Sequence, residues 1–413
     1  MVGAGVAGLS AAIACGDAGM QAIVYEAGPQ PGGRCRSYYD RELGCRVDNG
    51  NHLLLSGNRA ALSLLDRIGA RDTMAGPGRP LFPFFDLSTG ERWTVRPSNG
   101  RLPWWIFDPR RRVPGTRARD YLALSKLRRP APGATVAGLL RRDTLYRRLI
   151  EPLAVAALNT RPEAGAATLM ATVVNETLAQ GGAACIPSFP RQGWSESLID
   201  PAVATVRGQG GELHTGRRVT GLRMDRGRVA AIETADGPVL LGPGDAVILA
   251  VPPWIAPTLL PGVPAPSAFE AILNVHFAVD VERGEAGFVG LIGGTAEWVF
   301  NKPGHVSVTI SAANRLMDEA ADRIAGLVWP EVSRALGLSG PMPPWRVVKE
   351  KRATFAATPA QDRLRPGSRT QWPNLAVAGD WTATNLPATI EGAIRSGRTA
   401  AGIVAAGETR FGE

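Results

Sequence analysis

Apolar residues along this chain of 413 residues follow two different periods, and segments of the two kinds alternate. Short apolar runs over 22–25, 245–251 and 374–378 are typical of strands that are buried on both faces. Leucine and isoleucine at helical spacing predict segments of the other kind. The predicted helices cover 60–68, 120–158, 166–178, 197–207, 318–336 and the end of the chain. This alternation predicts an α/β fold.

The middle of the chain follows a different pattern. A hairpin is predicted around Asp236-Gly237, because this turn signal separates apolar runs over 228–234 and 239–241. Further strands are predicted over 273–281, 287–291, 298–301 and 306–311. The stretch from Gly76 to Pro114 is rich in proline, glycine and aromatic residues, so we expect it to interrupt regular structure. The pattern therefore predicts a second, α+β part inserted into the α/β part.

Three glycines open the chain at the spacing of a dinucleotide-binding turn. Gly3 would permit the turn, Gly5 would let the backbone approach a pyrophosphate, and Gly8 would let the next helix pack on its strand. Small residues also open ordinary buried helices. Glu26, however, ends the second strand 18 residues after Gly8, where an acid that binds ribose is expected. We therefore predict dinucleotide binding.

The first strand of this unit is short, because only Met1 and Val2 precede Gly3. A central parallel strand forms hydrogen bonds on both sides. We therefore expect its loss to leave buried backbone groups unpaired and to weaken cofactor binding. We accordingly expect the native chain to begin upstream of Met1.

Two polar loops follow the second strand. The loop Pro31-Gly32-Gly33-Arg34 offers backbone and guanidinium groups to phosphate oxygens, or is a plain Gly-Pro turn. The next polar cluster, Asp48-Asn49-Gly50-Asn51-His52, either caps its own turn or faces the ring of a bound cofactor. Near the end of the chain, Gly379-Asp380 follows a predicted strand and precedes the last helix. An acid there suits a polyol hydroxyl group and a second phosphate contact, or caps the helix.

Charge is unevenly distributed. The formal net charge is +9, but the segment 92–148 alone holds fifteen Lys and Arg against three Asp. Aromatic residues are interleaved with these cations from residue 81 onward, which is typical of a surface that binds an anionic membrane. A solvated helix face beside an ordinary core is the alternative. Nucleic-acid binding is disfavoured by the interleaved aromatic residues. We therefore expect the segment 81–148 to contact a membrane surface.

Cysteine and histidine usage points away from metal and disulfide chemistry. Four cysteines show no paired spacing, and four histidines are too scattered for a metal site, so we expect none. Reduced thiols suggest a cytoplasmic setting. No run of 18 apolar residues would span a membrane. With the basic segment, this predicts a cytoplasmic protein that is peripheral on the inner face of the cell membrane.

Taken together, these motifs resemble the FAD-dependent amine oxidase and carotenoid desaturase superfamily. Its FAD motifs match the three opening glycines, Glu26, Gly32-Gly33-Arg34 and Gly379-Asp380 in order along the chain. Three shorter stretches resemble hydroxysqualene dehydroxylase, also called squalene-associated FAD-dependent desaturase. They are Asp48-Asn49-Gly50-Asn51-His52, residues 153–159, and Leu386-Pro387-Ala388-Thr389-Ile390-Glu391-Gly392-Ala393.

The resemblance implies a fold, a cofactor and roles. The fold would be a discontinuous Rossmann-like FAD-binding domain (1–75, 191–260 and 370–413). Inserted into it would be a substrate domain, mainly helical and membrane-facing over 76–190, with a sheet and helix over 261–369. The opening glycines would hold the pyrophosphate of FAD and Glu26 its ribose. Arg34 would lie near phosphate or flavin, with Gly33 beside it. Val219 would contact the adenine, and Asp380 would bind a ribityl or phosphate oxygen. Ile390 and Glu391 would lie beside the flavin ring.

The implied activity is reductive removal of the hydroxyl group of hydroxysqualene, a polyisoprenoid, to give squalene for hopanoid synthesis. Reduced flavin would supply the hydride, and the electron donor to the flavin is unknown. We nominate His52 or Asp48 as the proton donor. Three rivals stay open: a phytoene-type desaturase, a flavin amine oxidase with Lys302 as its lysine, and a non-enzymatic protein without its cofactor.

Overall fold

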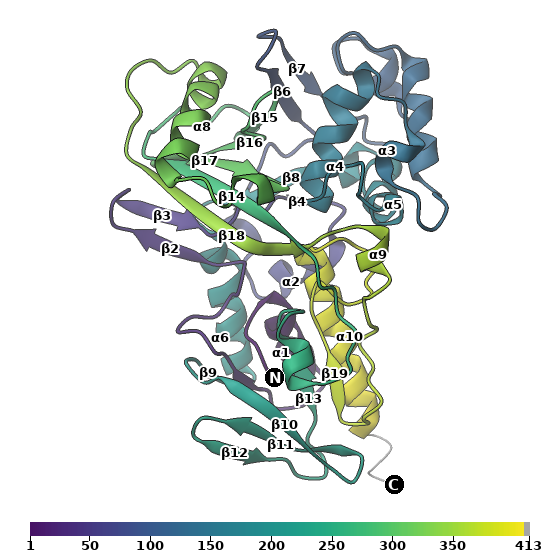
Figure 1. Ribbon diagram of the computed structural model, residues 1–413, viewed down its shortest axis with the longest axis vertical. Helices are drawn as coiled ribbons and strands as arrows, with labels where there is room; N and C mark the ends of the chain where they lie inside the picture. The colour runs from purple at the N-terminus through teal and green to yellow at the C-terminus, as the bar shows by residue number, and fades with distance from the viewer. Residues whose placement is uncertain (409–413) are drawn as a thin grey trace.

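The structure, a computed structural model, describes residues 1–408. The molecule is elongated (Figure 1). Helices α1, α6 and α10 surround short parallel strands in one half, and a seven-stranded sheet with α8 forms much of the other half. This arrangement agrees with the predicted α/β fold and its inserted α+β part. None of the helices described within this range is both long and apolar enough to cross a membrane.

The nucleotide-binding half is assembled from three separate stretches of sequence. Strand β1 pairs in parallel with β9, and β13 pairs in parallel with β19. The elements of this half are α1 (Val6–Asp17), β1 (Ile23–Tyr25), η7 (Ser195–Ile199), α6 (Asp200–Gly208), β9 (Glu212–His214), β10 (Val219–Asp225), β11 (Arg228–Thr234), β12 (Gly237–Leu240), β13 (Val247–Leu249), α7 (Ala256–Leu259), β19 (Leu375–Val377) and α10 (Ile390–Glu408).

Val2 joins the two pairs of strands, because it forms parallel bridges to Tyr25 on one side and Leu249 on the other. Its N–H donates to the carbonyl of Ile248 at 2.9 Å, and its carbonyl accepts from Ala250 at 2.8 Å. The carbonyl of Met1 accepts from Tyr25 at 2.9 Å. The unpaired backbone groups expected from the short first strand are therefore not found at Met1 and Val2.

A seven-stranded mixed sheet dominates the other half, in the order β18-β14-β17-β16-β15-β6-β7. All neighbours are antiparallel except β15 and β6. Its elements are β6 (Phe82–Asp86), β7 (Arg92–Val95), β14 (Phe269–Phe277), β15 (Phe288–Ile292), β16 (Trp298–Lys302), β17 (His305–Ile310), η8 (Ala313–Leu316), α8 (Ala321–Leu336), β18 (Trp345–Phe355) and α9 (Pro359–Asp362). Regular structure was not expected between Gly76 and Pro114, and this expectation is wrong for β6 and β7.

The two faces of this sheet differ in composition. Alternate residues of β14 and β17, including Leu273, Val275 and Val308, are fully buried in one core cluster with α8. The registers place Asn274 opposite Thr309 and His276 opposite Ser307 on the other face. Because successive side chains of a strand point to opposite faces, this second face is polar where the first is apolar.

A helical part and a set of short connecting elements complete the molecule. The predicted long helix over 120–158 is broken into shorter pieces in the structure. The helical elements are η2 (Trp104–Phe107), η3 (Ala118–Leu127), α3 (Val136–Leu139), η4 (Tyr146–Ile150), α4 (Glu151–Leu158), α5 (Ala167–Glu176), η5 (Leu178–Gln180) and η6 (Gly182–Ala184). The connecting elements are β2 (Ser37–Asp40), β3 (Cys45–Asp48), β4 (Leu54–Leu55), α2 (Arg59–Arg67), η1 (Arg71–Thr73), β5 (Met74–Ala75) and β8 (Pro187–Pro190).

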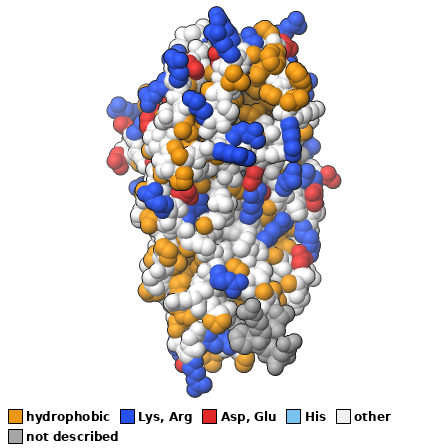
Figure 2. Space-filling view, turned by 90° about the vertical axis from the view of Figure 1, so that its right-hand side faces the viewer, with side chains coloured by type: hydrophobic (Ala, Val, Ile, Leu, Met, Phe, Trp, Pro, Cys, Tyr) orange, Lys and Arg blue, Asp and Glu red, His pale blue; other side chains and the backbone are white. Residues whose placement is uncertain are grey.

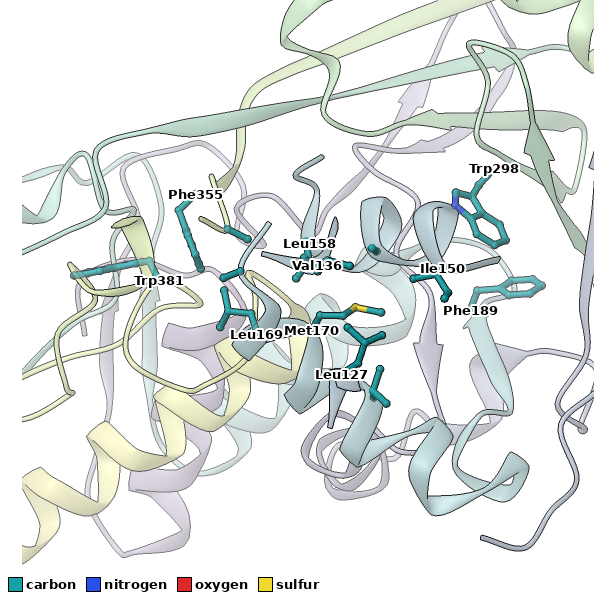
Figure 3. Close-up of a cluster of buried hydrophobic side chains, with 14 of the residues drawn as sticks. Leu127, Val136, Ile150, Leu158, Leu169, Met170, Phe189, Trp298, Phe355 and Trp381 are labelled. Carbon is teal, nitrogen blue, oxygen red and sulfur yellow. The ribbon is translucent and has the colours of Figure 1, made fainter. Parts of the chain in front are cut away.

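One continuous apolar cluster joins these parts (Figure 3). Leu127, Ile150 and Met170 of the helical part lie in it, together with Trp298 of the sheet and Trp381 of the nucleotide-binding half. The helical part is therefore packed against both halves, and residues of all three regions share one core.

Candidate active site

The opening glycines form a tight turn that leads directly into α1. Gly3 has φ +102°, which side chains disfavour. A Cβ on Gly8 would lie 2.0 Å from the carbonyl oxygen of Gly3, so only glycine lets α1 pack this closely. A Cβ on Gly5 would meet nothing within 4 Å. Open space over the first amide groups of a helix is what a bound pyrophosphate requires, and the turn fits the phosphates of FAD.

The loop Pro31-Gly32-Gly33-Arg34, which the sequence predicts as a phosphate-binding loop, lies against this turn. Gly32 forms a bridge with Gly5, and its N–H donates to the carbonyl of Ala4 at 2.8 Å. A Cβ on Gly33 would lie 3.5 Å from the Cα of Gly5. The structure therefore brings together the two glycine segments that the sequence places about 28 residues apart.

Glu26 stands at the end of β1 with its carboxylate turned back to the glycine turn. It accepts hydrogen bonds from the N–H groups of Ala4 at 2.8 Å and Gly28 at 2.7 Å. Each carboxylate oxygen keeps further lone pairs that can accept from ribose hydroxyl groups. The N–H of Arg217 donates to the carbonyl of Glu26, which brings the start of β10 and the buried Val219 into this neighbourhood.

Arg34 and Asp380 form an ion pair across the two ends of the chain, with 2.7 Å between Nη2 and Oδ1. Nη1 of Arg34 also donates to the carbonyl of Ala353 on β18 at 2.6 Å. Gly379, just before Asp380, donates its N–H to Ser396 of α10 at 2.8 Å. The two predicted residues thus lie at one place, where the glycine loop, β18 and the end of β19 meet.

The start of α10 has a structural task that the sequence did not indicate. The buried carboxylate of Glu391 accepts from the N–H groups of Ala60 at 3.0 Å and Ala61 at 2.8 Å, in the first turn of α2. Arg395 pairs with the same carboxylate. The side chain of Glu391 is therefore committed to α2, while the half-buried Ile390 begins the helix.

Asp48 is buried at the end of β3 and joins three segments. Its carboxylate accepts from Ser37 at 2.6 Å and from the N–H of Trp194 at 3.0 Å, and it pairs with Lys302. Burial alone raises the pKa of a carboxyl group, but the charge and hydrogen bond of Lys302 outweigh it, so the pKa of Asp48 lies below its ordinary value. Asp48 is consequently ionised and carries no proton at neutral pH.

His52 has a ring nitrogen, Nε2, that is out of contact with water and has no hydrogen-bond partner within the described part of the chain. Its ring stands edge-on to Trp194, with 5.9 Å between centroids. Burial lowers the pKa of His52, and the charge of Asp48 and a hydrogen bond to the backbone of Arg34 oppose this effect. His52 therefore lies beside the predicted cofactor residues.

The sheet contributes polar residues that the sequence analysis missed. The Nδ2 atom of Asn51 donates to the hydroxyl groups of Ser307 at 2.7 Å and Thr309 at 3.0 Å. It also lies 3.4 Å from Oδ1 of Asn274. Polar residues at every second position of otherwise apolar strands, as in Leu273-Asn274-Val275-His276-Phe277, are the signal that could have revealed this patch.

Comparison with known proteins identifies the family. The family described as flavin containing amine oxidoreductase matches residues 6–281 and 293–405. Hydroxysqualene dehydroxylase of Rhodopseudomonas palustris is 47% identical over 98% of this chain and 98% of its own length. The protein of the same name from Sinorhizobium fredii is 45% identical over 97% and 96%. The 15-cis-phytoene desaturase of Glycine max is 22% identical over 97% of this chain and 78% of its own.

Solved structures show the same fold at low sequence identity. Cyclohexylamine oxidase from Brevibacterium oxydans has a TM-score of 0.73 at 16% identity, covering 100% of this chain and 98% of its own. Wild-type putrescine oxidase with bound putrescine has a TM-score of 0.70 at 16% identity, covering 98% of each chain. The fold, the family match and the relatives agree: this chain belongs to the flavin containing amine oxidoreductase family and, within it, to the hydroxysqualene dehydroxylases.

Proposed function

We propose that this FAD-dependent oxidoreductase removes the hydroxyl group of hydroxysqualene and releases squalene, which serves hopanoid synthesis. The observation that carries the proposal is the full-length identity of 44–47% to three proteins named hydroxysqualene dehydroxylase. The glycine turn, Glu26 and the Arg34–Asp380 pair support FAD as the cofactor. They offer N–H, guanidinium and carboxylate groups that suit its phosphate and hydroxyl groups.

The reaction replaces an allylic carbon–oxygen bond with a carbon–hydrogen bond. The oxygen takes up a proton and leaves as water, and the carbon accepts a hydride. FAD, when bound and reduced, supplies the hydride. The protein has to position the alcohol, supply the proton and keep bulk water away from the electron-poor carbon.

We propose His52, rather than Asp48, as the proton donor. The Nε2 atom of His52 is buried and has no partner in the described part of the chain, so it is free to form a hydrogen bond with a substrate oxygen. Asp48 is held in its ion pair with Lys302 and has no proton to give at neutral pH. In this proposal Asp48 has a structural role: its ion pair holds the side chain of Lys302 and the start of the loop, at the end of β3, in place.

Aromatic residues on the same face of the sheet suit a polyisoprenoid chain. The registers place Trp298 opposite Thr309 and Phe300 opposite Ser307, so both rings flank the polar patch. Phe288 packs against them, with ring centroids 6.0 and 5.8 Å away. The apolar surfaces of such rings suit a hydrocarbon chain, and their electron-rich faces favour the one carbon that becomes positively charged as the oxygen leaves.

The experiment that tests the proposed function is product analysis. Dithionite-reduced enzyme incubated with hydroxysqualene should form squalene, and oxidised enzyme incubated with phytoene should form no desaturated product. A product from phytoene alone would contradict the proposal and favour the phytoene-type desaturase. The 15-cis-phytoene desaturase of Glycine max is a distant relative of that kind. Turnover of an amine with reduction of the flavin would favour the amine oxidase rival.

We further propose that the segment 81–148 contacts a membrane surface on the cytoplasmic side. Four large apolar side chains stand out in it: Leu102 (62% exposed), Trp104 (66%), Phe107 (63%) and Leu122 (71%). In η2 the two middle residues, Trp105 and Ile106, are buried, so the helix holds Trp104 and Phe107 outward. The face that carries the helical part shows many Lys and Arg side chains and an apolar group near its top (Figure 2).

A further inference from the structure

The side-chain amide of Asn274 has a defined orientation, because a backbone carbonyl can only accept hydrogen bonds. The carbonyl oxygen of Asn49 lies 3.2 Å from Nδ2 of Asn274, which is therefore the donor. The Oδ1 atom of Asn274 must then face the other way, toward Thr309, whose hydroxyl group donates to it at 3.0 Å.

The orientation of Asn51 follows from that of Asn274. The atom of Asn51 that faces Oδ1 of Asn274 has to be a donor, and it is Nδ2, at 3.4 Å. The same Nδ2 donates to the hydroxyl groups of Ser307 and Thr309. The amide is thus fixed on the sheet by its nitrogen, and its carbonyl oxygen, Oδ1, is turned away from all three partners.

That oxygen is buried and has no hydrogen-bond partner among the described residues. A buried acceptor without a partner destabilises the fold, so its presence in a fixed orientation points to a ligand that donates a hydrogen. The neighbouring His52 also holds an unpaired, buried Nε2. A Cβ on Gly50 would lie 3.5 Å from this atom and 3.9 Å from Nδ2 of Asn274, so these groups belong to one polar site.

We propose that Oδ1 of Asn51 accepts a hydrogen bond from the hydroxyl group of the polyisoprenoid alcohol and so orients its oxygen toward His52. An alcohol has one hydrogen to donate and keeps lone pairs on its oxygen for the incoming proton. The product squalene has no hydroxyl group and cannot form this bond. Asn51 therefore distinguishes substrate from product, a role that rests on the proposed function above.

The test compares the binding of alcohol and hydrocarbon in the oxidised holoenzyme, followed by the change in flavin absorbance. The wild-type protein should bind hydroxysqualene about tenfold more tightly than squalene, as one buried hydrogen bond predicts. Asn51→Leu should remove this preference while the affinity for squalene stays unchanged. Ser307→Ala is the matched control: it removes one partner of Asn51 but leaves the orienting Asn274, and the preference should survive.

Retention of the preference in Asn51→Leu would overturn the inference. If that variant does not fold with FAD, the methyl ether of hydroxysqualene replaces it, because the ether lacks the hydrogen. Wild-type protein should bind the ether no better than squalene, and binding as tight as that of the alcohol would overturn the inference as well. Failure of the proposed function is separate, since wild-type enzyme would then form no squalene.

Discussion

The loop from Asp48 to His52 combines a carboxylate that stays ionised with an imidazole that can change its protonation state. Asp48 is held ionised by Lys302, whereas the imidazole of His52 is kept mainly neutral, because burial lowers its pKa. Two ionisable groups of one loop whose pKa values are set by such different environments are typical of a site in which only one of them transfers a proton. The sheet below holds this loop through Asn51.

The pH dependence of turnover tests His52 as the donor. Its pKa lies below the ordinary value of 6.5, so the protonated fraction falls as pH rises above that value. The turnover number of the reduced enzyme should therefore fall about tenfold per pH unit between about pH 6.5 and about pH 8.5. His52→Ala should lower turnover by about 10²–10⁴-fold and abolish the slope.

His305→Asn is the control, because His305 is buried outside the loop, beside Cys45. It should keep the slope of the wild-type enzyme. A slope that persists in His52→Ala would assign the proton to another group.

At this scale the sequence identified the loop but not its partners. The polar run from Asp48 to His52 is visible because five adjacent residues differ from their apolar surroundings. Ser307, Thr309 and Asn274 lie more than 200 residues further along, and only the register of β14 against β17 places them under the loop. Cross-strand register depends on tertiary pairing, which no local pattern contains.

Among the secondary-structure elements, α1 is the one whose approach to its neighbours depends most directly on single residues. Gly8 lets the helix touch the turn, while Gly5 leaves space above it. The two glycines therefore have different tasks, although they belong to one motif.

Alanine at each position separates the two tasks. Gly8→Ala places a Cβ 2.0 Å from a backbone oxygen, so the free energy of unfolding and the FAD content of purified protein should both fall. Gly5→Ala meets no atom, so the apoprotein should unfold as before. The added methyl group should nevertheless weaken FAD binding by at least about tenfold, because it occupies the approach of the pyrophosphate.

Thermal unfolding of apoprotein and FAD titration measure these effects. Gly402→Ala, which also meets open space but on α10, is the matched control and should leave FAD affinity unchanged. Unchanged FAD affinity in Gly5→Ala would show that the cofactor lies elsewhere.

Elements with a clear period were predicted well, and elements without one were not. The helices α2, α5 and α8 follow apolar spacing in the sequence. Strand β18 is an edge strand with charged residues over much of its length, and β6 contains Pro83, so neither has the pattern of a buried strand. The predicted long helix fails because prolines and glycines divide it between residues 130 and 138.

The molecule as a whole has a strongly basic region over 92–148, and its outward aromatic residues stand on a helix that is anchored in the core. Trp104 and Phe107 contact each other, with 6.2 Å between ring centroids, while their neighbours anchor η2 in the core. Such an anchored aromatic surface suits the proposed contact with a lipid headgroup layer.

Vesicle binding tests the membrane proposal. The protein should bind vesicles containing phosphatidylglycerol and bind poorly to vesicles of phosphatidylcholine alone, and binding should weaken with added salt. The double variant Trp104→Ser, Phe107→Ser should bind at least about tenfold more weakly, since each buried aromatic side chain contributes about 1.5–3 kcal/mol.

Leu240→Ser, at an equally exposed leucine on β12, is the control and should bind as the wild-type protein does. Equal binding to both kinds of vesicle, or no effect of the double variant, would contradict the proposal. Turnover of detergent-dispersed substrate should be the same in all three proteins.

The alternation along β14 and β17 separates recognition from folding. In the proposed site, substitutions at Asn274, His276 or Thr309 would change the polar face that lies toward the loop, whereas the intervening residues face α8. If the substrate binds as proposed, single substitutions on the polar face can alter substrate recognition while the core on the reverse side stays intact. The same separation makes these three positions the natural choice for a library that aims to redirect the enzyme to other long-chain alcohols.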